Sequence, residues 1–327
     1  MKIAINGFGR IGRSITKVIA NRTDLELVAI NDIEDSKSLY YLLKYDSIHG
    51  ICNKVTFENN TLFINNKPIK VLNEIDNQNI DFGEVDVVFE CTGRNLTTDK
   101  VKHHLNKGVK KVIISAPVED NTPTFVLGVN EEKYKGENII SNASCTTNCL
   151  GPIAKVLDKN FRIKKGLMTT IHSYTNDQKI LDVKHTRDIR RGRAASINMI
   201  PTFTGAAKAM YKVLPSLKGK LHGQSVRVPV ADVSIVDFNV EVSKNTTKEE
   251  LQKLFIKYAN NEFSGILGLD SEKLVSNDML ENSFSSNVAL DLIQVVDGNM
   301  IKVMSWYDNE WGYSNRMCDM AKLVFSR

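Results

Sequence analysis

The stretch Lys2-Ile3-Ala4-Ile5-Asn6-Gly7-Phe8-Gly9-Arg10-Ile11-Gly12 gives the strongest indication of architecture in this 327-residue chain. Residues 2–7 predict a short apolar strand and residues 10–21 show helical periodicity, while the glycines between them fit the pattern G-x-G-x-x-G. In a strand, turn and helix unit such glycines let the backbone approach a pyrophosphate, whose charge is met by the helix N-terminus. The stretch therefore predicts a dinucleotide-binding domain.

The chain after this turn continues the same pattern. An apolar strand at 25–30 ends in Asn31-Asp32, and Asp32 lies 20 residues beyond Gly12, a spacing that suits a carboxylate bonded to the adenosine ribose of NAD. Strands at 85–90 and 112–115 with a helix at about 98–107 between them predict a parallel, doubly wound sheet. Segments between 51 and 72, with Asn-Asn turns, predict inserted hairpins.

The second half of the chain predicts a different architecture. Helices are expected at about 145–160, 202–214 and 247–261, and strands at 167–172, 225–229, 233–242, 287–296 and 302–307. Long alternating strands with such helices indicate a mixed, largely antiparallel sheet covered on one face. The predicted fold class is therefore α/β, with a Rossmann-type doubly wound parallel sheet plus an α+β substrate domain. The segment 176–200 is polar and basic, and 310–325 is amphipathic.

The octapeptide Asn142-Ala143-Ser144-Cys145-Thr146-Thr147-Asn148-Cys149 sets a thiol among small polar residues, just before a helix-like run. A helix N-terminus favours a thiolate, so we expect greater thiolate character for Cys145 than for a cysteine in an apolar core. Cys149, one helical turn later, is expected to be a small buried side chain. His172, in the next strand, would activate Cys145 as a nucleophile if the fold brought them together.

The composition and the order of apolar residues indicate which classes of protein this chain can belong to. A 42% hydrophobic composition supports about two soluble domains, and no run of roughly 18 apolar residues predicts a membrane span or membrane partner. No signal peptide is expected, and five irregularly spaced cysteines fit reduced thiols in the cytoplasm. The basic cluster at 184–193 lacks interleaved aromatic residues, so we expect phosphorylated small molecules and not nucleic acid as primary partners. No metal site is predicted.

The segment SNASCTTNCLGPIAK (141–155) resembles the active-site segment of phosphorylating glyceraldehyde-3-phosphate dehydrogenases. The resemblance runs through the whole chain, in the segments INGFGRIGR, SAPVEDNTPTFVLGVN, IHSYTNDQ, DIRRGRAAS, IPTFTGAAKA, VRVPV and SWYDNEWGYS. It implies a glycolytic or gluconeogenic enzyme that converts D-glyceraldehyde 3-phosphate and inorganic phosphate to 1,3-bisphosphoglycerate. Cys145 would form a thiohemiacetal and then a thioester, and His172 would act as general base.

The same resemblance implies the binding residues. NAD contacts are expected at Asn6, Gly7, Phe8, Gly9, Arg10, Ile11, Gly12, Asp32, Thr92, Ser115, Asn309 and Tyr313. Substrate-phosphate contacts are expected at Thr175, Asp177 and Arg227 with Arg191 nearby, and attacking-phosphate contacts at Ser144, Thr146, Thr204 and Gly205. It further implies a homotetramer with 176–200 as a central loop. The NAD-binding domain would span 1–147, completed by helix 311–327, and the catalytic domain 148–310.

Some positions depart from the family pattern. Val183-Lys184 stands where many NAD-using members carry Leu-Pro, Gly192 replaces an alanine, and Ile75 replaces an arginine. Lys184 would attract the extra phosphate of NADP, but Asp32 would repel it, so NAD is expected in preference to NADP. Two alternatives remain: erythrose-4-phosphate dehydrogenase, which TFTGAAKA disfavours, and a non-catalytic nucleotide- or RNA-binding protein on the same fold.

Overall fold

A computed structural model describes residues 1–326, which form two compact units. Unit 1 comprises residues 1–125, 132–144 and the chain from Ser314, and unit 2 comprises Val126–Glu131 and Cys145–Tyr313. No helix within residues 1–326 has the length and apolar character needed to cross a membrane.

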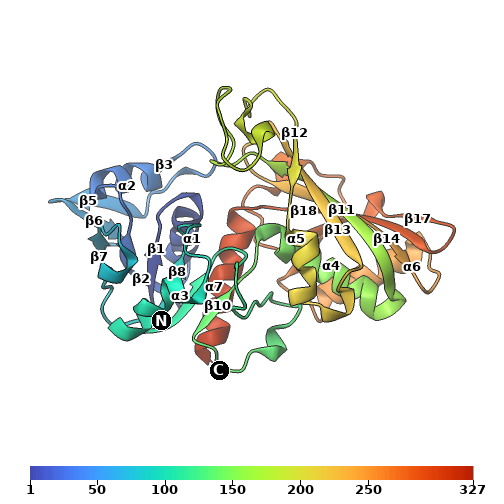
Figure 1. The fold of residues 1–327 in the computed structure, drawn as a ribbon, viewed down its shortest axis with the longest axis horizontal. Helices are drawn as coiled ribbons and strands as arrows, with labels where there is room; N and C mark the ends of the chain where they lie inside the picture. The colour runs from blue at the N-terminus through green and yellow to red at the C-terminus, as the bar shows by residue number, and fades with distance from the viewer. Residues whose placement is uncertain (327) are drawn as a thin grey trace. The chain divides into compact units, whose positions relative to one another are not determined.

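Unit 1 is built on a sheet with strand order β10-β9-β8-β1-β2-β7-β6-β5 (Figure 1). The pairs from β10 to β7 are parallel, which confirms the doubly wound prediction. The strands of this parallel part are β1 (Lys2–Asn6), β2 (Glu26–Asn31), β7 (Lys67–Leu72), β8 (Val85–Glu90), β9 (Val109–Ile114) and β10 (Ile139–Ser141). The helices are α1 (Arg10–Ala20), α2 (Ser36–Lys44), α3 (Thr98–Val101) and, from Ser314, most of α7 (Trp311–Ser326).

The predicted hairpins are confirmed as an antiparallel extension of this sheet. β5 (Val55–Glu58), β6 (Thr61–Ile64) and β7 pair in sequence, and β7 joins the parallel part beside β2. Both turns are Asn-Asn pairs with positive φ, 48° and 62° in the first and 50° and 62° in the second. Two consecutive left-handed residues match the twist of the flanking strands, and asparagine tolerates this conformation. A small separate pair, β3 (Tyr45–Asp46) and β4 (Gly50–Ile51), follows α2.

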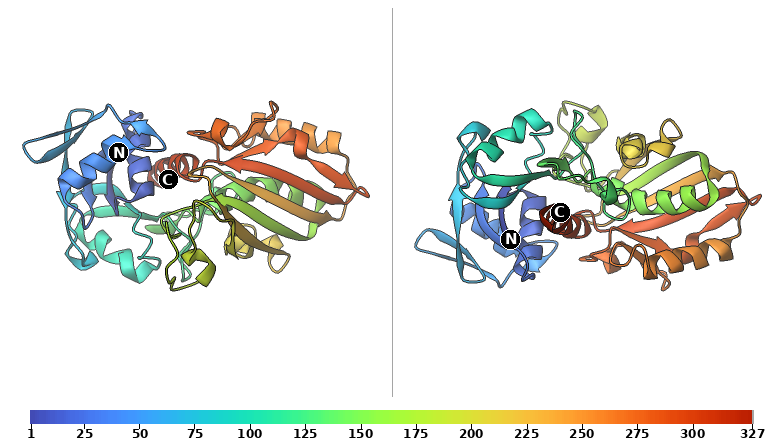
Figure 2. Two further views of the ribbon diagram at one scale, coloured as in Figure 1. Left: turned by 90° about the horizontal axis from the view of Figure 1, so that it is seen from above. Right: turned by 90° about the horizontal axis from the view of Figure 1, so that it is seen from below.

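Unit 2 contains the predicted mixed, largely antiparallel sheet, in the order β12-β13-β11-β14-β18-β16-β15, with β17 also beside β18 (Figure 2). The bounds are β11 (Ile163–Ser173), β12 (Ile200–Phe203), β13 (Leu221–Val228), β14 (Ser234–Val242), β15 (Leu267–Asp270), β16 (Ser286–Ala289), β17 (Gln294–Val296) and β18 (Met300–Tyr307). Helix α4 (Cys145–Phe161) packs on β11, β14, β16 and β18, and α6 (Lys248–Asn260) on β15. Alternate residues of β14 and β18 are buried, so one sheet face forms the core.

Three predicted elements differ from the structure. The expected helix at 98–107 is α-helical only in α3 and continues as a 3-10 helix, Lys102–Lys107, whose His, His and Asn residues are weak helix formers. The expected strand at 287–296 is two strands, because α6 side chains Lys248 and Gln252 bond the carbonyls of Asp291 and Leu290 in a turn. The expected helix at 202–214 starts as β12, followed by α5 (Ala206–Ala209) and a 3-10 turn.

Candidate active site

The glycine turn of unit 1 is sterically closed to larger residues at two positions. Gly7 has φ of 92°, and a Cβ there would lie 2.7 Å from the Thr92 nitrogen. A Cβ on Gly12 would lie 2.4 Å from the carbonyl oxygen of Gly7. Real Cβ contacts are not this short, so the turn and its packing against α1 need glycine at both positions.

Gly9 has different surroundings, because no heavy atom lies within 4 Å of the position that a Cβ would take. It is also the N-cap of α1, and no side chain caps that helix end. Beside it, Asp32 accepts hydrogen bonds at 2.6 Å from the Phe8 nitrogen and at 3.1 Å from the Glu34 nitrogen. An open helix N-terminus next to a fixed carboxylate fits the pyrophosphate and ribose of a dinucleotide.

Glu90 connects several of the expected NAD-contact residues, although the sequence did not single it out. Its carboxylate accepts from Asn6 Nδ2 at 2.7 Å and from the Thr92 nitrogen at 2.9 Å, and the Ser115 hydroxyl donates to its carbonyl oxygen at 2.9 Å. Burial raises the pKa of Glu90. Arg10 is directed elsewhere, since its guanidinium pairs with Asp46 at 3.0 Å. Phe8 is buried and Ile11 is half-buried.

In unit 2 the structure brings the predicted nucleophile and base together. Cys145 is the first residue of α4, and its Sγ lies 3.7 Å from Nε2 of His172 on β11. His172 is opposite Arg227 in the register between β11 and β13, two parallel neighbours. The pairing of these strands therefore sets an imidazole and a guanidinium side by side next to the first turn of α4.

His172 is held as a neutral imidazole. Its Nδ1 lies 2.7 Å from the carbonyl oxygen of Ser173 and 2.7 Å from a terminal nitrogen of Arg227, and Arg227 also donates to that carbonyl at 2.9 Å. Burial, followed by the positive charge of Arg227, lowers the pKa of His172 to about 3. At neutral pH the ring carries no charge, and in the tautomer whose Nδ1 donates to the Ser173 carbonyl, Nε2 can accept a proton.

The two cysteines of the octapeptide differ in the neighbouring groups that lower the pKa of the thiol against the effect of burial. Burial raises the pKa of the Cys145 thiol, while the charge of Arg227 and hydrogen bonds from the nitrogen and hydroxyl of Thr146 lower it. Burial raises the pKa of Cys149 to about 12, and its sulfur lies 3.6 Å from the Ser286 hydroxyl. Of the two thiols, only that of Cys145 has a neighbouring cation that favours the thiolate, although burial still dominates there.

Apart from Ser144, which belongs to unit 1, the expected phosphate-binding residues fall into separate groups within unit 2. Arg191 is ion-paired with Asp177 at 2.7 Å, bonds Thr202 at 2.8 Å and lies over the ring of Phe203. The nitrogen and hydroxyl of Thr175 both donate to the Gln178 side chain. Near the start of α5, the Thr204 hydroxyl accepts from the Ala206 nitrogen, and Gly205 faces open space. The guanidinium of Arg227 lies instead beside the catalytic pair, against His172 and the Ser173 carbonyl.

Asn309 is fixed by two serines that the sequence did not indicate. Its Oδ1 accepts from the hydroxyl of Ser173 at 2.9 Å and from that of Ser234 at 2.7 Å, and all three residues are buried. The amide nitrogen is therefore the group that Asn309 offers as a donor. Tyr313 is buried, Thr146 is buried and Ser144 is half-buried.

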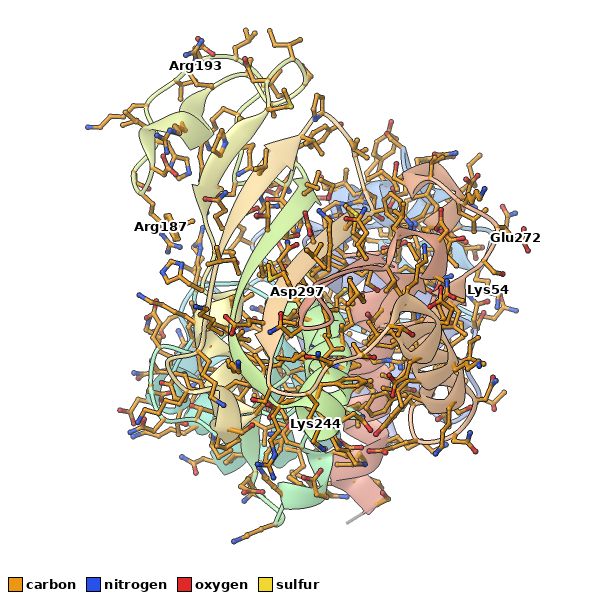
Figure 3. The ribbon with its side chains drawn as sticks, turned by 90° about the vertical axis from the view of Figure 1, so that its right-hand side faces the viewer. Lys54, Arg187, Arg193, Lys244, Glu272 and Asp297 are labelled. Atoms are coloured by element: carbon orange, nitrogen blue, oxygen red, sulfur yellow. The ribbon has the colours of Figure 1, made fainter. Side chains whose placement is uncertain are left out.

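Two departures from the family pattern are in contact in the basic loop. The Val183 nitrogen donates to the Gly192 carbonyl at 2.9 Å, and a Cβ on Gly192 would lie 2.0 Å from the Val183 carbonyl oxygen. Lys184 is exposed. Arg187 and Arg193 lie on the same loop (Figure 3), where Arg193 pairs with Asp182 at 2.9 Å.

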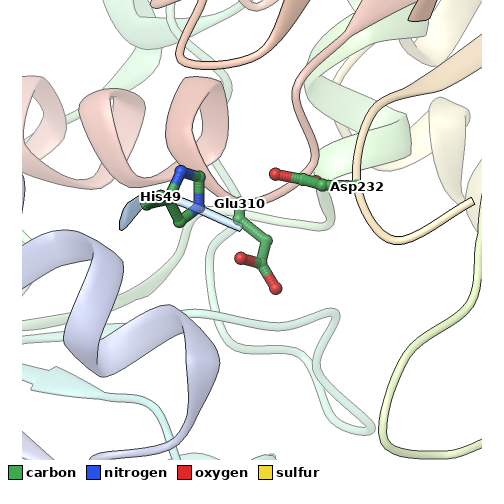
Figure 4. Close-up of side chains that lie close together, drawn as sticks. All are labelled: His49, Asp232 and Glu310. Atoms are coloured by element: carbon green, nitrogen blue, oxygen red, sulfur yellow. The ribbon is translucent and has the colours of Figure 1, made fainter. Parts of the chain in front are cut away.

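Unit 2 also contains buried acidic residues, of which Asp232 and Glu310 are drawn in Figure 4. Burial, then the negative charges of Asp308 and Glu310, raises the pKa of Asp232 to about 9. Asp232 is therefore protonated at neutral pH. Sequence reasoning did not indicate this cluster, because Asp232 lies between β13 and β14 whereas Asp308 and Glu310 lie between β18 and α7, and their proximity depends on the fold.

Comparisons with known proteins identify the family that this chain resembles along its length. A family model described as "Glyceraldehyde 3-phosphate dehydrogenase, NAD binding domain" matches residues 1–98, and the corresponding C-terminal domain model matches residues 144–309. "Glyceraldehyde-3-phosphate dehydrogenase 1" of Bacillus cereus is 53% identical over 332 aligned positions, covering 100% of this chain and 99% of the relative. The enzyme of Geobacillus stearothermophilus is 49% identical with the same coverage, and that of Helicobacter pylori is 47% identical over 99% of each chain.

Proposed function

This chain belongs to the glyceraldehyde-3-phosphate dehydrogenase family, and from that membership we propose that it oxidises and phosphorylates D-glyceraldehyde 3-phosphate to 1,3-bisphosphoglycerate with NAD. The observation that carries the proposal is the pair formed by Cys145 at the start of α4 and His172, with Sγ and Nε2 3.7 Å apart. A thiol beside a neutral imidazole is the arrangement required for covalent catalysis on a carbonyl.

The residues of unit 2 account for each proton and bond of this reaction. A proton passes from the Cys145 thiol to Nε2 of His172, the thiolate attacks the aldehyde carbon, and the proton passes to the resulting alkoxide to give a thiohemiacetal. Nε2 then removes that hydroxyl proton as general base. NAD, when bound, supplies the hydride acceptor. Loss of the proton and hydride leaves a thioester on Cys145, and inorganic phosphate displaces the sulfur to give the acyl phosphate. The neutral state of His172 suits it to the base role.

In unit 1 the chain's own groups fit the cofactor. The uncapped N-terminus of α1 at Gly9 would meet the pyrophosphate, and Asp32 would bond the ribose. In unit 2 the amide of Asn309, held by Ser173 and Ser234, would bond the nicotinamide carboxamide. The assignment of residues 1–147 with 311–327 to NAD binding and of 148–310 to catalysis is part of this proposal.

The phosphate contacts are proposed from the resemblance to the family, with Arg227 as the expected residue that directly contacts the catalytic pair. Arg227, Thr175 and Asp177, with Arg191 nearby, would hold the substrate phosphate. The attacking phosphate would bind at Ser144, Thr146, Thr204 and Gly205. Arg227 supports this assignment most strongly, since its guanidinium is mostly buried and directly contacts His172.

A homotetramer is proposed from the surfaces that unit 2 leaves exposed. Leu167, Phe203 and Met300 on the sheet are 65%, 59% and 43% exposed, and the sheet borders a hollow of about 1000 Å³ whose lining includes Leu167, Leu221 and Met300 as well as five lysines. In the basic loop Ile180 and Ile189 are also highly exposed. Apolar surface of this extent is typical of subunit interfaces. We further place the protein in the cytoplasm, where the five free cysteines would stay reduced.

The test follows nicotinamide absorbance with glyceraldehyde 3-phosphate, with and without inorganic phosphate, and with erythrose 4-phosphate in parallel. Steady-state turnover should require phosphate, and Cys145→Ser should abolish it without loss of NAD binding. Cys52→Ser, a change at a half-buried cysteine of unit 1, is the matched control and should keep activity. Phosphate-independent turnover, faster erythrose 4-phosphate oxidation or a fully active Cys145→Ser protein would refute the proposal.

A further inference from the structure

Three buried hydroxyl groups lie in a row beside the catalytic pair. The hydroxyl of Tyr307, on β18, is 3.0 Å from Thr146 Oγ1 on α4 and 2.8 Å from Thr170 Oγ1 on β11. All three side chains are at most 5% exposed. None of these hydrogen bonds is required to form the sheet or the helix, and neither Tyr307 nor Thr170 was identified from the sequence.

The direction of hydrogen bonding along this row of hydroxyl groups follows from the fact that each hydroxyl has one proton to donate. Thr146 directly follows Cys145 at the start of α4, and its hydroxyl favours the Cys145 thiolate, which it can do only by directing its one proton towards the sulfur. Thr146 must then accept from Tyr307. Tyr307 has one proton as well, so it must accept from Thr170. Burial, and next the charge of a Cys145 thiolate, raises the pKa of Tyr307, which keeps the phenol protonated.

Tyr307 also contacts the other member of the catalytic pair. Its ring meets the His172 ring edge to face, with centroids 5.9 Å apart and planes at 80°. One side chain therefore links α4, β11 and β18 at the point where the thiol and imidazole meet. A tyrosine can do this because its ring packs and its hydroxyl both donates and accepts.

We propose that Tyr307 is a positioning residue of the active site, and that the directed chain from Thr170 through Tyr307 to Thr146 stabilises the Cys145 thiolate. The inference deepens the proposed function and rests on Cys145 being its nucleophile. Each hydroxyl in such a chain polarises the next, so removal of the middle one weakens the bond that reaches the sulfur. Tyr307 touches neither sulfur nor substrate in this account, and acts through Thr146.

The test measures the pH dependence of Cys145 alkylation by iodoacetamide, followed by peptide mass, in the substrate-free protein. Tyr307→Phe keeps the ring and removes the hydroxyl. It should raise the apparent pKa of alkylation by about 0.5 to 1 unit, which lowers the rate at pH 7 roughly three- to tenfold. Tyr258→Phe is the matched control, because Tyr258 is also buried and bonds Asn160 at 3.2 Å outside the site.

Substitutions of Thr170 give a second series of variants in which Tyr307 is unchanged. Thr170→Val should shift the profile in the same direction by a smaller amount, and Thr170→Ser should restore it. Tyr307→Phe or Thr170→Val profiles that overlay the control in a folded, NAD-binding protein would overturn the relay. If Tyr307→Phe does not fold, the Thr170 series decides. Because alkylation needs no turnover, an altered profile in a protein without dehydrogenase activity would reject the proposed function and leave the relay standing.

Discussion

The glycine turn of unit 1 and the catalytic cluster of unit 2 are built in opposite ways. The turn depends on main-chain atoms, and eleven consecutive residues, 2–12, contain nearly all of it. In the cluster, side chains from α4, β11, β13, β14 and β18 meet, over more than 150 residues of chain. A site made of backbone should therefore fail through steric clashes, and a site made of side chains through the loss of single functional groups.

After loss of the Cys145 nucleophile itself, the largest effect is expected from the general base, His172. His172→Asn removes the group that accepts the proton, and general-base assistance contributes about 100- to 10,000-fold, so turnover should fall by about that factor with the fold intact. Stopped-flow and steady-state rates across pH 6 to 9 measure it. Near-normal turnover with an unchanged pH profile would show that another group is the base.

The glycine turn gives the matching test in unit 1. Gly12→Ala forces a Cβ against the Gly7 carbonyl and should cost about 1 to 3 kcal/mol of stability. Gly9→Ala meets no neighbouring atom, so it should keep the stability but weaken NAD binding, since Gly9 borders the uncapped helix end. Chemical unfolding and NAD titration separate the two. Equal stability loss in both variants would mean that steric closure does not distinguish these glycines.

The preference for NAD over NADP depends on two residues with opposite expected effects, the carboxylate of Asp32 in unit 1 and the ammonium group of Lys184 in unit 2. Asp32 is fixed by two backbone nitrogens, whereas Lys184 is exposed on a loop and its attraction to phosphate is weakened by salt. We predict a clear preference for NAD. Asp32→Ala should reduce that preference by about tenfold, and Lys184→Pro should lower residual NADP use. Comparable kcat/KM for the two cofactors in the unmodified protein at physiological salt would make Lys184 the deciding residue.

The smallest effect is expected from Asp232, whose replacement by a residue that cannot ionise should reduce the pH dependence of the protein's stability. A carboxyl with its pKa raised to about 9 in the folded state, from about 3.9 when unfolded, stabilises the fold fully below pH 4 and loses that contribution as pH rises towards 9. Asp232→Asn cannot ionise, so its Tm should exceed that of the unmodified protein by a few degrees at pH 9 and by less at pH 5. A constant difference at both pH values would contradict this.

The sequence predicted most of the fold because its elements are local. Strand β8 and helix α6 match their expected positions to within a residue, and short alternating segments with Asn-Asn turns between them indicated the hairpins of β5 to β7. The errors arose where distant side chains intervene, as when Lys248 and Gln252 of α6 bond the turn between β16 and β17. Propensity over a short window contains no information about such partners.

The same limit explains which site residues were missed. Cys145 and His172 stood out through their chemistry, and the structure places them together. Glu90, Ser173, Ser234 and Tyr307 are ordinary strand residues whose importance depends on register, for instance the pairing of Ser234 with Tyr307 between β14 and β18. Register is a tertiary property, so residue type alone did not separate them from core positions.

The contact between Gly192 and the Val183 carbonyl has an evolutionary consequence. With only 2.0 Å available for a Cβ, an alanine at 192 is compatible only with a different path of the chain at 183 and 184. The two positions are therefore epistatic: the effect of a substitution at one depends on the residue at the other. A lineage moving between Val-Lys with glycine and Leu-Pro with alanine would need both changes, and exchange of either half alone should be the disfavoured intermediate.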